Sequence, residues 1–326
     1  MQRVGLLGKR NLRYLLGTVL GNEFFIFYFV LRINIYMMYV VNMACGLANR
    51  MFQYSYYLYL KKVGYDVSVD YYETGKLAHE SVEWNQIFPK AYISQVSWRE
   101  VLRLGGGGSV FAKLRRRYLP FTTRVKYMPT AFSVYLPEKD SKAAYLFGVF
   151  QNAQMVNEVN EDVRKAFVFS PFEDEQNQTL TKEIAECESV SIHVRKGADY
   201  MERIWYQNTC SLSYYEKAIE LMKKKVSSPK FYVFADNHEW VRENFKGFDY
   251  ILVEGNPSVG WGSHFDMQLM SLCHHNIISN STYSWWGAFL NESVNKIVVM
   301  PEVWFNPKSC DDYTSTKLMC EGWIAL

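Results

Sequence analysis

Short apolar runs that alternate with helical patterns are the feature that most constrains the fold of this chain. From residue 189 onward, five runs have the composition of short buried strands: 189–194, 230–235, 249–254, 276–279 and 296–300. Helical patterns such as those over 213–225 and 236–245 separate most of these runs. Strands that alternate with helices favour a parallel sheet covered by helices, so the sequence predicts the α/β class.

The region before residue 189 shows the same alternation less regularly. An apolar stretch over 33–41 predicts a buried strand, and the turn at Gly46 opens an amphipathic segment that runs through Leu60. A chain of 326 residues, of which 49% are hydrophobic, suits two medium α/β domains better than one small module. We predict an extension over 1–37, an N-terminal Rossmann-like domain over 38–165 and a C-terminal Rossmann-like domain over 166–326.

The first strand of the C-terminal region leads into a loop that carries a histidine and an arginine. Ser189 to Val194 alternates apolar and polar residues, so His193 and Arg195 lie where the strand passes into a loop containing Gly197. Ligands of α/β proteins meet groups just beyond the carboxyl ends of strands. An Arg there is a planar donor suited to a phosphate, although a structural ion pair is an equally good interpretation of this run alone.

Two further segments combine a strand, a turn and the start of a helix. Gly46 and Asn49 follow the strand predicted over 33–41, and a helix start at that point can face an anion. A tight turn without a ligand is the alternative, because one Gly is weaker than a Gly-rich fingerprint. Downstream, Asn280, Ser281 and Thr282 are good helix caps whose side chains can donate to a phosphate.

Trp285 and Trp286 follow these capping residues directly. Large aromatic residues in the first turns of a helix pack in a core more often than they stack on a ligand. We therefore expect both tryptophans in the core, with a contact from Trp285 or Tyr283 to a ligand ring as the alternative.

Four segments in this order resemble the family 11 glycosyltransferases, the inverting α-1,2-fucosyltransferases, in their bacterial form. The segments are 46–54, 193–200, 231–245 and 280–290, and the resemblance extends from about residue 38 to the C-terminus. It implies the GT-B fold, in which two Rossmann-like domains face each other across a cleft. The N-terminal domain would then lie on the acceptor side, and the C-terminal domain would bind the nucleotide sugar. The His-x-Arg core also occurs in α-1,6- and protein O-fucosyltransferases, so it specifies the donor better than the linkage.

The chain departs from the family pattern at three positions. Ala48 stands where the family often has a second Gly, and Lys196 replaces a second Arg. Lysine keeps the charge but loses the planar fork of arginine. Ala198 adds one residue before Asp199, which weakens the transfer of the family's role to that aspartate.

The resemblance implies transfer of L-fucose from GDP-fucose to the 2-hydroxyl of a galactoside in a surface polysaccharide or oligosaccharide. Arg195 would stabilise the charge that grows on the departing diphosphate. His193 would orient the diphosphate or the ribose, or is simply hydrogen-bonded within its loop. Asp199 is the candidate general base for the acceptor hydroxyl. The donor-binding residues implied are Gly46, Asn49, Arg50, Arg195, Asp266 (against guanine), Asn280, Ser281, Thr282 and Ser284.

We expect no metal and no other cofactor. The sequence contains no Asp-x-Asp, and its six Cys and six His show no zinc spacing. In this interpretation Arg195 takes the place of the divalent cation, and GDP-fucose is a substrate.

Residues 99–126 combine four consecutive glycines with a basic cluster next to Phe111, Leu114 and Tyr118. Four glycines do not suit a helix interior, so we expect a flexible loop or hinge within an insertion in the N-terminal domain. The basic cluster favours either contact with anionic lipid at a membrane surface or a solvated helix face.

Charge and cysteine usage bear on partners and location. A net charge of +3 is too small to indicate a nucleic-acid partner. The six dispersed cysteines fit reduced thiols and a cytoplasmic location, with peripheral contact at the inner face of the membrane as a further hypothesis. Residues 12–30 are a poor membrane span, because Arg13, Asn22 and Glu23 interrupt them. We interpret 1–37 as a region translated from a misplaced start, or alternatively as a short membrane-binding segment.

Two other functions stay open from the sequence. One is a GT-B transferase that uses another nucleotide sugar or forms another fucosyl linkage. The other is a catalytically silent protein that binds a glycan or nucleotide, which only the departures at Ala48, Lys196 and Ala198 favour. A dinucleotide dehydrogenase is disfavoured, because the chain has no Gly-x-Gly-x-x-Gly.

Overall fold

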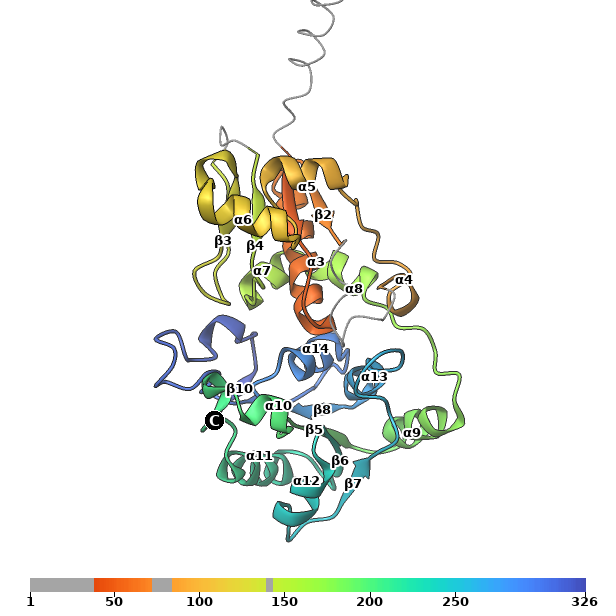
Figure 1. Cartoon of the computed structure of the whole chain (residues 1–326). Coiled ribbons are helices and arrows are strands. Elements are labelled where there is room, and N and C mark those ends of the chain that lie inside the picture. The colour runs from red at the N-terminus through yellow and green to blue at the C-terminus, as the bar shows by residue number, and fades with distance from the viewer. Residues whose placement is uncertain (1–37, 72–83, 139–142) are drawn as a thin grey trace, which may run out of the picture.

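The computed structural model describes residues 38–71, 84–138 and 143–326, so the extension predicted over 1–37 lies outside the described residues. Two sheets, one above the other in Figure 1, organise the described chain. The first has four strands in the order β2-β1-β4-β3, and every pair is parallel. Its strands are β1 (Tyr39–Asn42), β2 (Val67–Asp70), β3 (Val125–Tyr127) and β4 (Tyr145–Phe147).

The second sheet has six strands in the order β10-β9-β8-β5-β6-β7, again all parallel. Its strands are β5 (Ser189–Val194), β6 (Lys230–Ala235), β7 (Tyr250–Val253), β8 (His275–Ile277), β9 (Val298–Met300) and β10 (Ile324–Ala325). The five strands predicted after residue 189 are therefore present. The sixth, β10, was not predicted, because two residues at a sheet edge leave no periodic pattern.

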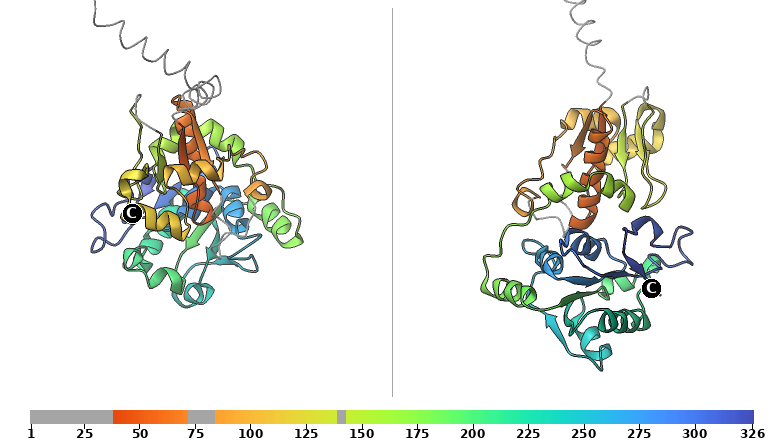
Figure 2. Two further views of the ribbon diagram at one scale, coloured as in Figure 1. Left: turned by 45° about the horizontal axis from the view of Figure 1, so that its top comes forward. Right: turned by 180° about the vertical axis from the view of Figure 1, so that it is seen from behind.

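Helices cover both sheets, which confirms the predicted α/β class (Figure 2). Those of the first half are α3 (Leu47–Lys62), α4 (Trp84–Ile87), α5 (Trp98–Leu104), α6 (Val110–Tyr118), α7 (Ala153–Glu158) and α8 (Asn160–Ala166). Those of the second half are α9 (Glu175–Ala185), α10 (Ala198–Met201), α11 (Leu212–Lys225), α12 (His238–Asn244), α13 (Phe265–Leu272) and α14 (Thr282–Leu290). Short 3-10 turns are η2 (Pro120–Thr122), η3 (Ile204–Tyr206) and η4 (Thr316–Leu318).

The central strand β5 determines where the loop after it lies. All six of its residues are buried, as expected for a strand with a neighbour on each side. It pairs with β8 on one side and with β6 on the other, where Val194 lies opposite Ala235. Because β5 and β6 end at the same level, Arg195 and Asp236 leave the sheet side by side.

The two halves share a continuous aromatic core. Trp285 and Trp286 on α14 are both fully buried, as expected for core residues, and each packs against Phe52 on α3, with ring centroids 4.7 and 4.9 Å apart. The indole N–H of Trp286 donates to the carbonyl oxygen of Ala48 at 2.9 Å. These contacts hold the start of α3 against the start of α14.

The strands of the two sheets lie on either side of residues 148–188, within which the predicted boundary falls. The boundary at residue 165 and the assignment of the acceptor to the N-terminal half stay predictions.

The four-glycine run connects α5 to α6. Gly105 ends α5 in the left-handed region, with φ of 84°, where glycine is favoured. Gly106 lies so close to the Tyr145 ring that a Cβ there would be 2.3 Å from it. The run is therefore a shaped connection outside any helix, and its predicted flexibility is untested.

Trp286→Ala should destabilise the protein strongly, because it leaves a cavity between α3 and α14 and removes the bond to Ala48. We expect a loss of about 3–5 kcal/mol in the free energy of unfolding, measured by urea denaturation. The control is Trp98→Ala, whose side chain is 58% exposed and for which a change below about 0.5 kcal/mol is expected. Equal effects for both variants would contradict a stabilising role for the contacts of Trp286 between α3 and α14.

Candidate active site

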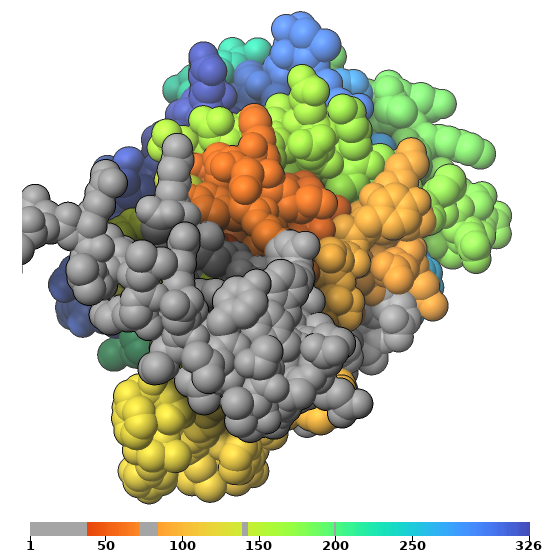
Figure 3. Space-filling model, turned by 90° about the horizontal axis from the view of Figure 1, so that it is seen from above, coloured from red at the N-terminus to blue at the C-terminus, as the bar shows by residue number. Residues whose placement is uncertain are grey.

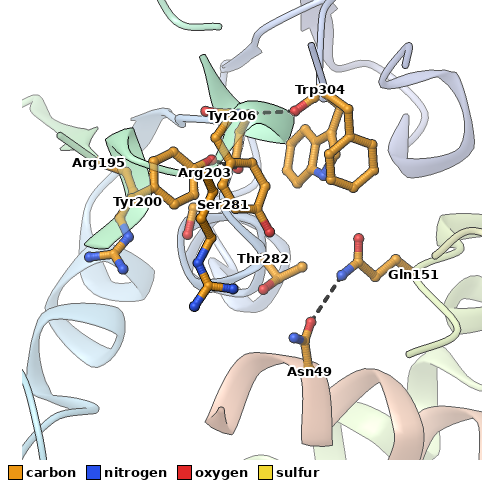
Figure 4. A pocket seen from close by; sticks show the side chains of 11 residues that line it. Asn49, Gln151, Arg195, Tyr200, Arg203, Tyr206, Ser281, Thr282 and Trp304 are labelled. Atoms are coloured by element: carbon orange, nitrogen blue, oxygen red, sulfur yellow. Dashed lines mark hydrogen bonds between the residues drawn. The ribbon is translucent and has the colours of Figure 1, made fainter. Parts of the chain in front are cut away.

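A cavity of about 280 Å³ lies between the two halves of the molecule (Figure 4). Asn49 and Gln151 line it from the N-terminal half. The remaining lining residues come from the C-terminal half and are Arg195, Tyr200, Arg203, Tyr206, Asn280, Ser281, Thr282, Trp304 and Phe305. Among the residues that the structure describes, the charged side chains that line this cavity are two arginines, with no Asp or Glu.

Asp236 holds the loop that carries Arg195. One carboxylate oxygen accepts a bond from the backbone N–H of Lys196 at 2.6 Å. The other accepts a bond from the N–H of Gly197 at 2.9 Å and pairs with the Arg195 guanidinium. Asp236 is the residue directly after β6, so the equal length of β5 and β6 delivers this acceptor to the loop.

A stacked tyrosine pair forms one wall of the cavity. The rings of Tyr200 and Tyr206 lie nearly parallel, with centroids 4.0 Å apart, and the Arg195 guanidinium lies 5.2 Å from the centre of the Tyr200 ring. The Tyr200 hydroxyl donates to the carbonyl oxygen of Asn280 at 2.7 Å, which ties α10 to the start of α14. Figure 4 shows Arg195 and Arg203 next to this tyrosine pair, with Asn49 and Gln151 across the cavity.

The N-terminus of α14 lies at the cavity. Ser281 is its N-cap, and the Ser281 hydroxyl accepts a bond from the N–H of Tyr283 at 3.3 Å. Ser281 and Thr282 both line the cavity. A helix N-terminus carries a partial positive charge, so it adds to the field of the two arginines.

Asn280 and Ser284 hold this helix start in place. The Asn280 side chain is buried and donates to the Thr209 hydroxyl at 2.8 Å and to the Trp304 carbonyl oxygen at 2.9 Å. Asn280 also lines the cavity, whereas Ser284 does not. The Ser284 hydroxyl donates back to the carbonyl oxygen of Ser281 at 3.2 Å.

His193 lies behind the cavity and does not line it. Its side chain is 6% exposed, and its Nδ1 lies 2.8 Å from the Ser279 hydroxyl. Burial, with a further contribution from the Arg195 charge, lowers the pKa of this imidazole to about 3. The ring is therefore neutral at physiological pH. The predicted contact of His193 with the diphosphate or the ribose of the sugar donor stays a prediction.

Lys196, the replacement for the family's second arginine, does not line the cavity. Its ammonium donates to the carbonyl oxygen of Thr209 at 3.3 Å and lies 5.4 Å from the centre of the Trp240 ring. Burial lowers the pKa of this lysine below its ordinary value. The Lys196 ammonium thus contacts Thr209 and Trp240 and does not face the cavity.

Of the donor-binding residues predicted in the N-terminal half, Asn49 lines the cavity, whereas Gly46 and Arg50 do not. Asn49 lines the cavity, where its side-chain oxygen accepts a bond from Gln151 at 3.0 Å. Gly46 is the N-cap of α3. Arg50 is 1% exposed and donates to the Tyr71 hydroxyl at 2.8 Å, so it lies within the domain and not on the cavity wall.

Of the two predicted acidic residues, Asp266 does not line the described cavity. Asp266 is in the first turn of α13, where its carboxylate accepts a bond from Asn256 at 2.8 Å. Burial raises the pKa of this carboxyl to about 6. Asp199 belongs to α10, and its side chain is outside the described part of the chain.

Sequence reasoning missed Arg203, Tyr206 and Asp236. Arg203 and Tyr206 reach the cavity because α10 and η3 fold back after the Arg195 loop, and no periodic pattern marks such a return. Asp236 carried a usable signal, because it directly follows the strand next to β5. Within the described residues, no group of three or more His, Cys, Asp or Glu side chains is arranged to hold a metal ion.

Two parallel-sheet domains with a cavity between them agree with the two-domain α/β arrangement that the resemblance implies. The sequence profile of Glycosyl transferase family 11 matches residues 130–325, and the chain belongs to that family. The predicted family is thereby confirmed, and three of the four motifs, 193–200, 231–245 and 280–290, lie within the matched residues.

Several named glycosyltransferases are similar in sequence to parts of this chain. The O-antigen biosynthesis glycosyltransferase WbnK of Escherichia coli is 33% identical over 65% of this chain and 69% of its own length. An alpha-1,2-colitosyltransferase of Escherichia coli is 31% identical over 55% of this chain and 61% of its own length. The galactoside alpha-(1,2)-fucosyltransferase 2 of Rattus norvegicus is 31% identical over 31% of this chain, and the match spans less than a third, 29%, of that protein.

Among solved structures, the alpha-1,6-fucosyltransferase NodZ soaked with GDP-fucose aligns with 78% of this chain and 92% of its own. The TM-score is 0.45 and the sequence identity is 14%.

Asp236→Ala should release the loop that carries Arg195, because the amide groups of Lys196 and Gly197 lose their acceptor. A buried donor left without a partner costs about 1–3 kcal/mol, so amide exchange in peptides covering 195–201 should accelerate roughly tenfold or more. Hydrogen–deuterium exchange with mass spectrometry measures this change. Asp249→Ala, at an exposed site before β7, is the control, and unchanged exchange in the Asp236 variant would refute the role.

Proposed function

We propose that this family 11 glycosyltransferase transfers L-fucose from GDP-fucose to the 2-hydroxyl of a galactoside in a surface glycan, with inversion. The observation that carries the proposal is the cavity wall, where Arg195, Arg203 and the α14 N-terminus converge. The names of the relatives support an α-1,2 linkage and a role in polysaccharide biosynthesis.

The leaving group explains why this wall suits the reaction. Cleavage of the bond between sugar and phosphate places growing negative charge on a nucleoside diphosphate. Fixed positive groups that meet this charge lower the barrier, because they need no reorganisation during the reaction. Arg195 is fixed by Asp236 and Tyr200, and the α14 N-terminus is fixed by Asn280. The family pattern has a second arginine at the position of Lys196, which does not line the cavity here. Arg203 lines the cavity and supplies the second cation instead.

Inversion by a single displacement requires a general base for the acceptor hydroxyl. Asp236 is already engaged by the Arg195 loop, and no carboxylate lines the cavity among the described residues. We propose Asp199 as this base, and Asp199→Asn would then lower turnover while leaving donor affinity nearly unchanged.

The positively charged side chains that line the cavity, Arg195 and Arg203, favour catalysis without a metal ion. We propose that the two arginines supply the charge that a divalent cation supplies in other transferases. We further propose a cytoplasmic location, which free thiols at Cys187, Cys210, Cys273, Cys310 and Cys320 support. No helix in the described ranges is long and apolar enough to span a bilayer.

Colitose is a second candidate sugar, because one relative is an alpha-1,2-colitosyltransferase. Colitose lacks the 3-hydroxyl of fucose, so the two donors differ by one polar group. A site built to hydrogen-bond that hydroxyl would reject the deoxy sugar by a factor of about 10⁴ or more. The ratio of kcat/KM for GDP-fucose and GDP-colitose therefore decides between the two donors.

The deciding experiment incubates the purified chain with GDP-fucose and lactose in excess EDTA. A trisaccharide with an α-1,2 linkage and inverted anomeric configuration would support donor, chemistry and metal independence together. Release of GDP without a trisaccharide would keep the donor and exclude lactose as acceptor. Absence of both products, with other GDP- and UDP-sugars turned over instead, would overturn the fucosyl assignment. Donor binding without any turnover would favour the silent binding protein.

Arg195→Ala should lower kcat/KM for the donor roughly a hundredfold, because the loss of a preorganised charge removes about 3 kcal/mol of transition-state stabilisation. Arg203→Ala should also lower kcat/KM for the donor. Arg203→Lys should lower it less, because the charge remains. Steady-state kinetics measure each effect. Arg99→Ala, an exposed arginine of α5, is the matched control. Turnover within tenfold of the parent for Arg195→Ala would rule out its role.

Affinity for GDP-fucose should fall as the pH falls through about 6, the raised pKa of Asp266. Only the ionised carboxylate can accept both adjacent N–H donors of guanine, and protonation removes that capacity. Bound donor stabilises the ionised form, so the apparent pKa in the complex should be lower than in the free protein. Calorimetric titration with GDP-fucose measures the change, since its phosphates do not titrate in this range. In Asp266→Asn the affinity should be weak and independent of pH; an unchanged profile would exclude the contact.

A further inference from the structure

Helix α6 presents its apolar side chains to solvent. Val110, Phe111 and Tyr118 are 73, 71 and 65% exposed, and Leu114 is 49% exposed. Their spacing of one, three and four residues places them on one face of the helix. Phe121, in the turn η2 that follows, is 82% exposed and extends this surface.

The opposite side of α6 is anchored to the domain. Ala112 is the one buried residue of the helix, and the Ser109 hydroxyl caps its start. The Arg115 guanidinium donates to the Leu102 carbonyl oxygen at 2.6 Å, and that of Arg116 donates to Gly105 and Gly107 at 2.7 and 2.8 Å. The helix is therefore held with its apolar face outward, and these two arginines of the basic cluster are structural.

Positive charge is concentrated around this face. Lys113 and Arg117 are exposed and lie along its edge. Residues 99–126 contain eight Lys or Arg and a single acidic residue, Glu100, which pairs with Arg103. The whole chain has a net charge of only +3, so the remainder of the molecule is net negative. The segment forms a lobe at the margin of the molecule in Figure 3, where its yellow atoms project beyond the rest.

We propose that α6 and η2 form a docking surface for an anionic lipid bilayer. Apolar side chains beside lysine and arginine match such a surface, because the former enter the interface while the latter meet acidic headgroups. The concentration of cations favours lipid over a second copy of this chain, whose corresponding face would be equally positive. This proposal rests on α6 and η2 alone and does not depend on the identity of the sugar donor.

Vesicle sedimentation with the full chain tests the proposal. We expect binding to vesicles of phosphatidylcholine with phosphatidylglycerol, and much weaker binding to phosphatidylcholine alone. Binding should weaken as salt is raised, because the charges are exposed. Equal binding to both vesicles, or none to either, would overturn the proposal.

Two double variants separate the contributions. Lys113→Glu with Arg117→Glu should reduce the partition coefficient roughly tenfold or more, since each basic residue near such a surface contributes appreciably. Phe111→Ser with Phe121→Ser should reduce it comparably through loss of apolar contact. The charge control is Lys224→Glu with Lys225→Glu at the exposed end of α11, and the apolar control is Val294→Ser, at a site that is 96% exposed.

Circular dichroism and transfer to a soluble acceptor should be unchanged in all variants, which distinguishes loss of docking from loss of folding. Binding that persists in both α6 double variants would place membrane attachment elsewhere in the chain and refute the surface. Concentration-dependent self-association that these variants abolish, without vesicle binding by the parent, would instead assign the face to a second copy.

Discussion

The parallel pairing of β5 with β6 and β8 is the constraint on which the rest of the site depends. Strands of a parallel sheet point in the same direction, so the residues that follow them gather at one edge. Here that edge receives Arg195 after β5, Asp236 after β6 and the segment leading into α14 after β8. Because Asp236 bonds to two backbone amides of the Arg195 loop, the guanidinium is oriented by the sheet and not by the loop alone.

The aromatic junction between α3 and α14 supplies the second wall. Contacts of Phe52 with Trp285 and Trp286 bring the start of α3 against the start of α14, and Asn49 thereby joins the cavity. A nucleotide sugar between these walls would meet positive charge from one domain and amide groups from the other. The packing of one pair of helices thus places Asn49 of one half opposite Arg195 and the α14 N-terminus of the other.

Much of the site was predictable because its residues belong to local patterns. Arg195, Ser281, Thr282 and Asn49 all follow strand-and-turn signals and all line the cavity. Arg203 was not predictable, since it depends on how α10 and η3 fold back over the loop. The inward position of Lys196 was equally hidden, because direction within a loop is decided by neighbours such as Trp240 that are distant in sequence.

By itself, the sequence determined the α/β class, the parallel strands after residue 189, the core position of the two tryptophans and the family of the chain. These properties follow from short-range periodicity and from motifs, which are encoded within a few residues. Only the tertiary structure decided that Asp236 holds the Arg195 loop, that His193 lies buried and neutral behind the cavity, and that α6 turns its apolar face outward. Each of these depends on long-range packing, which brings together side chains that no local pattern relates.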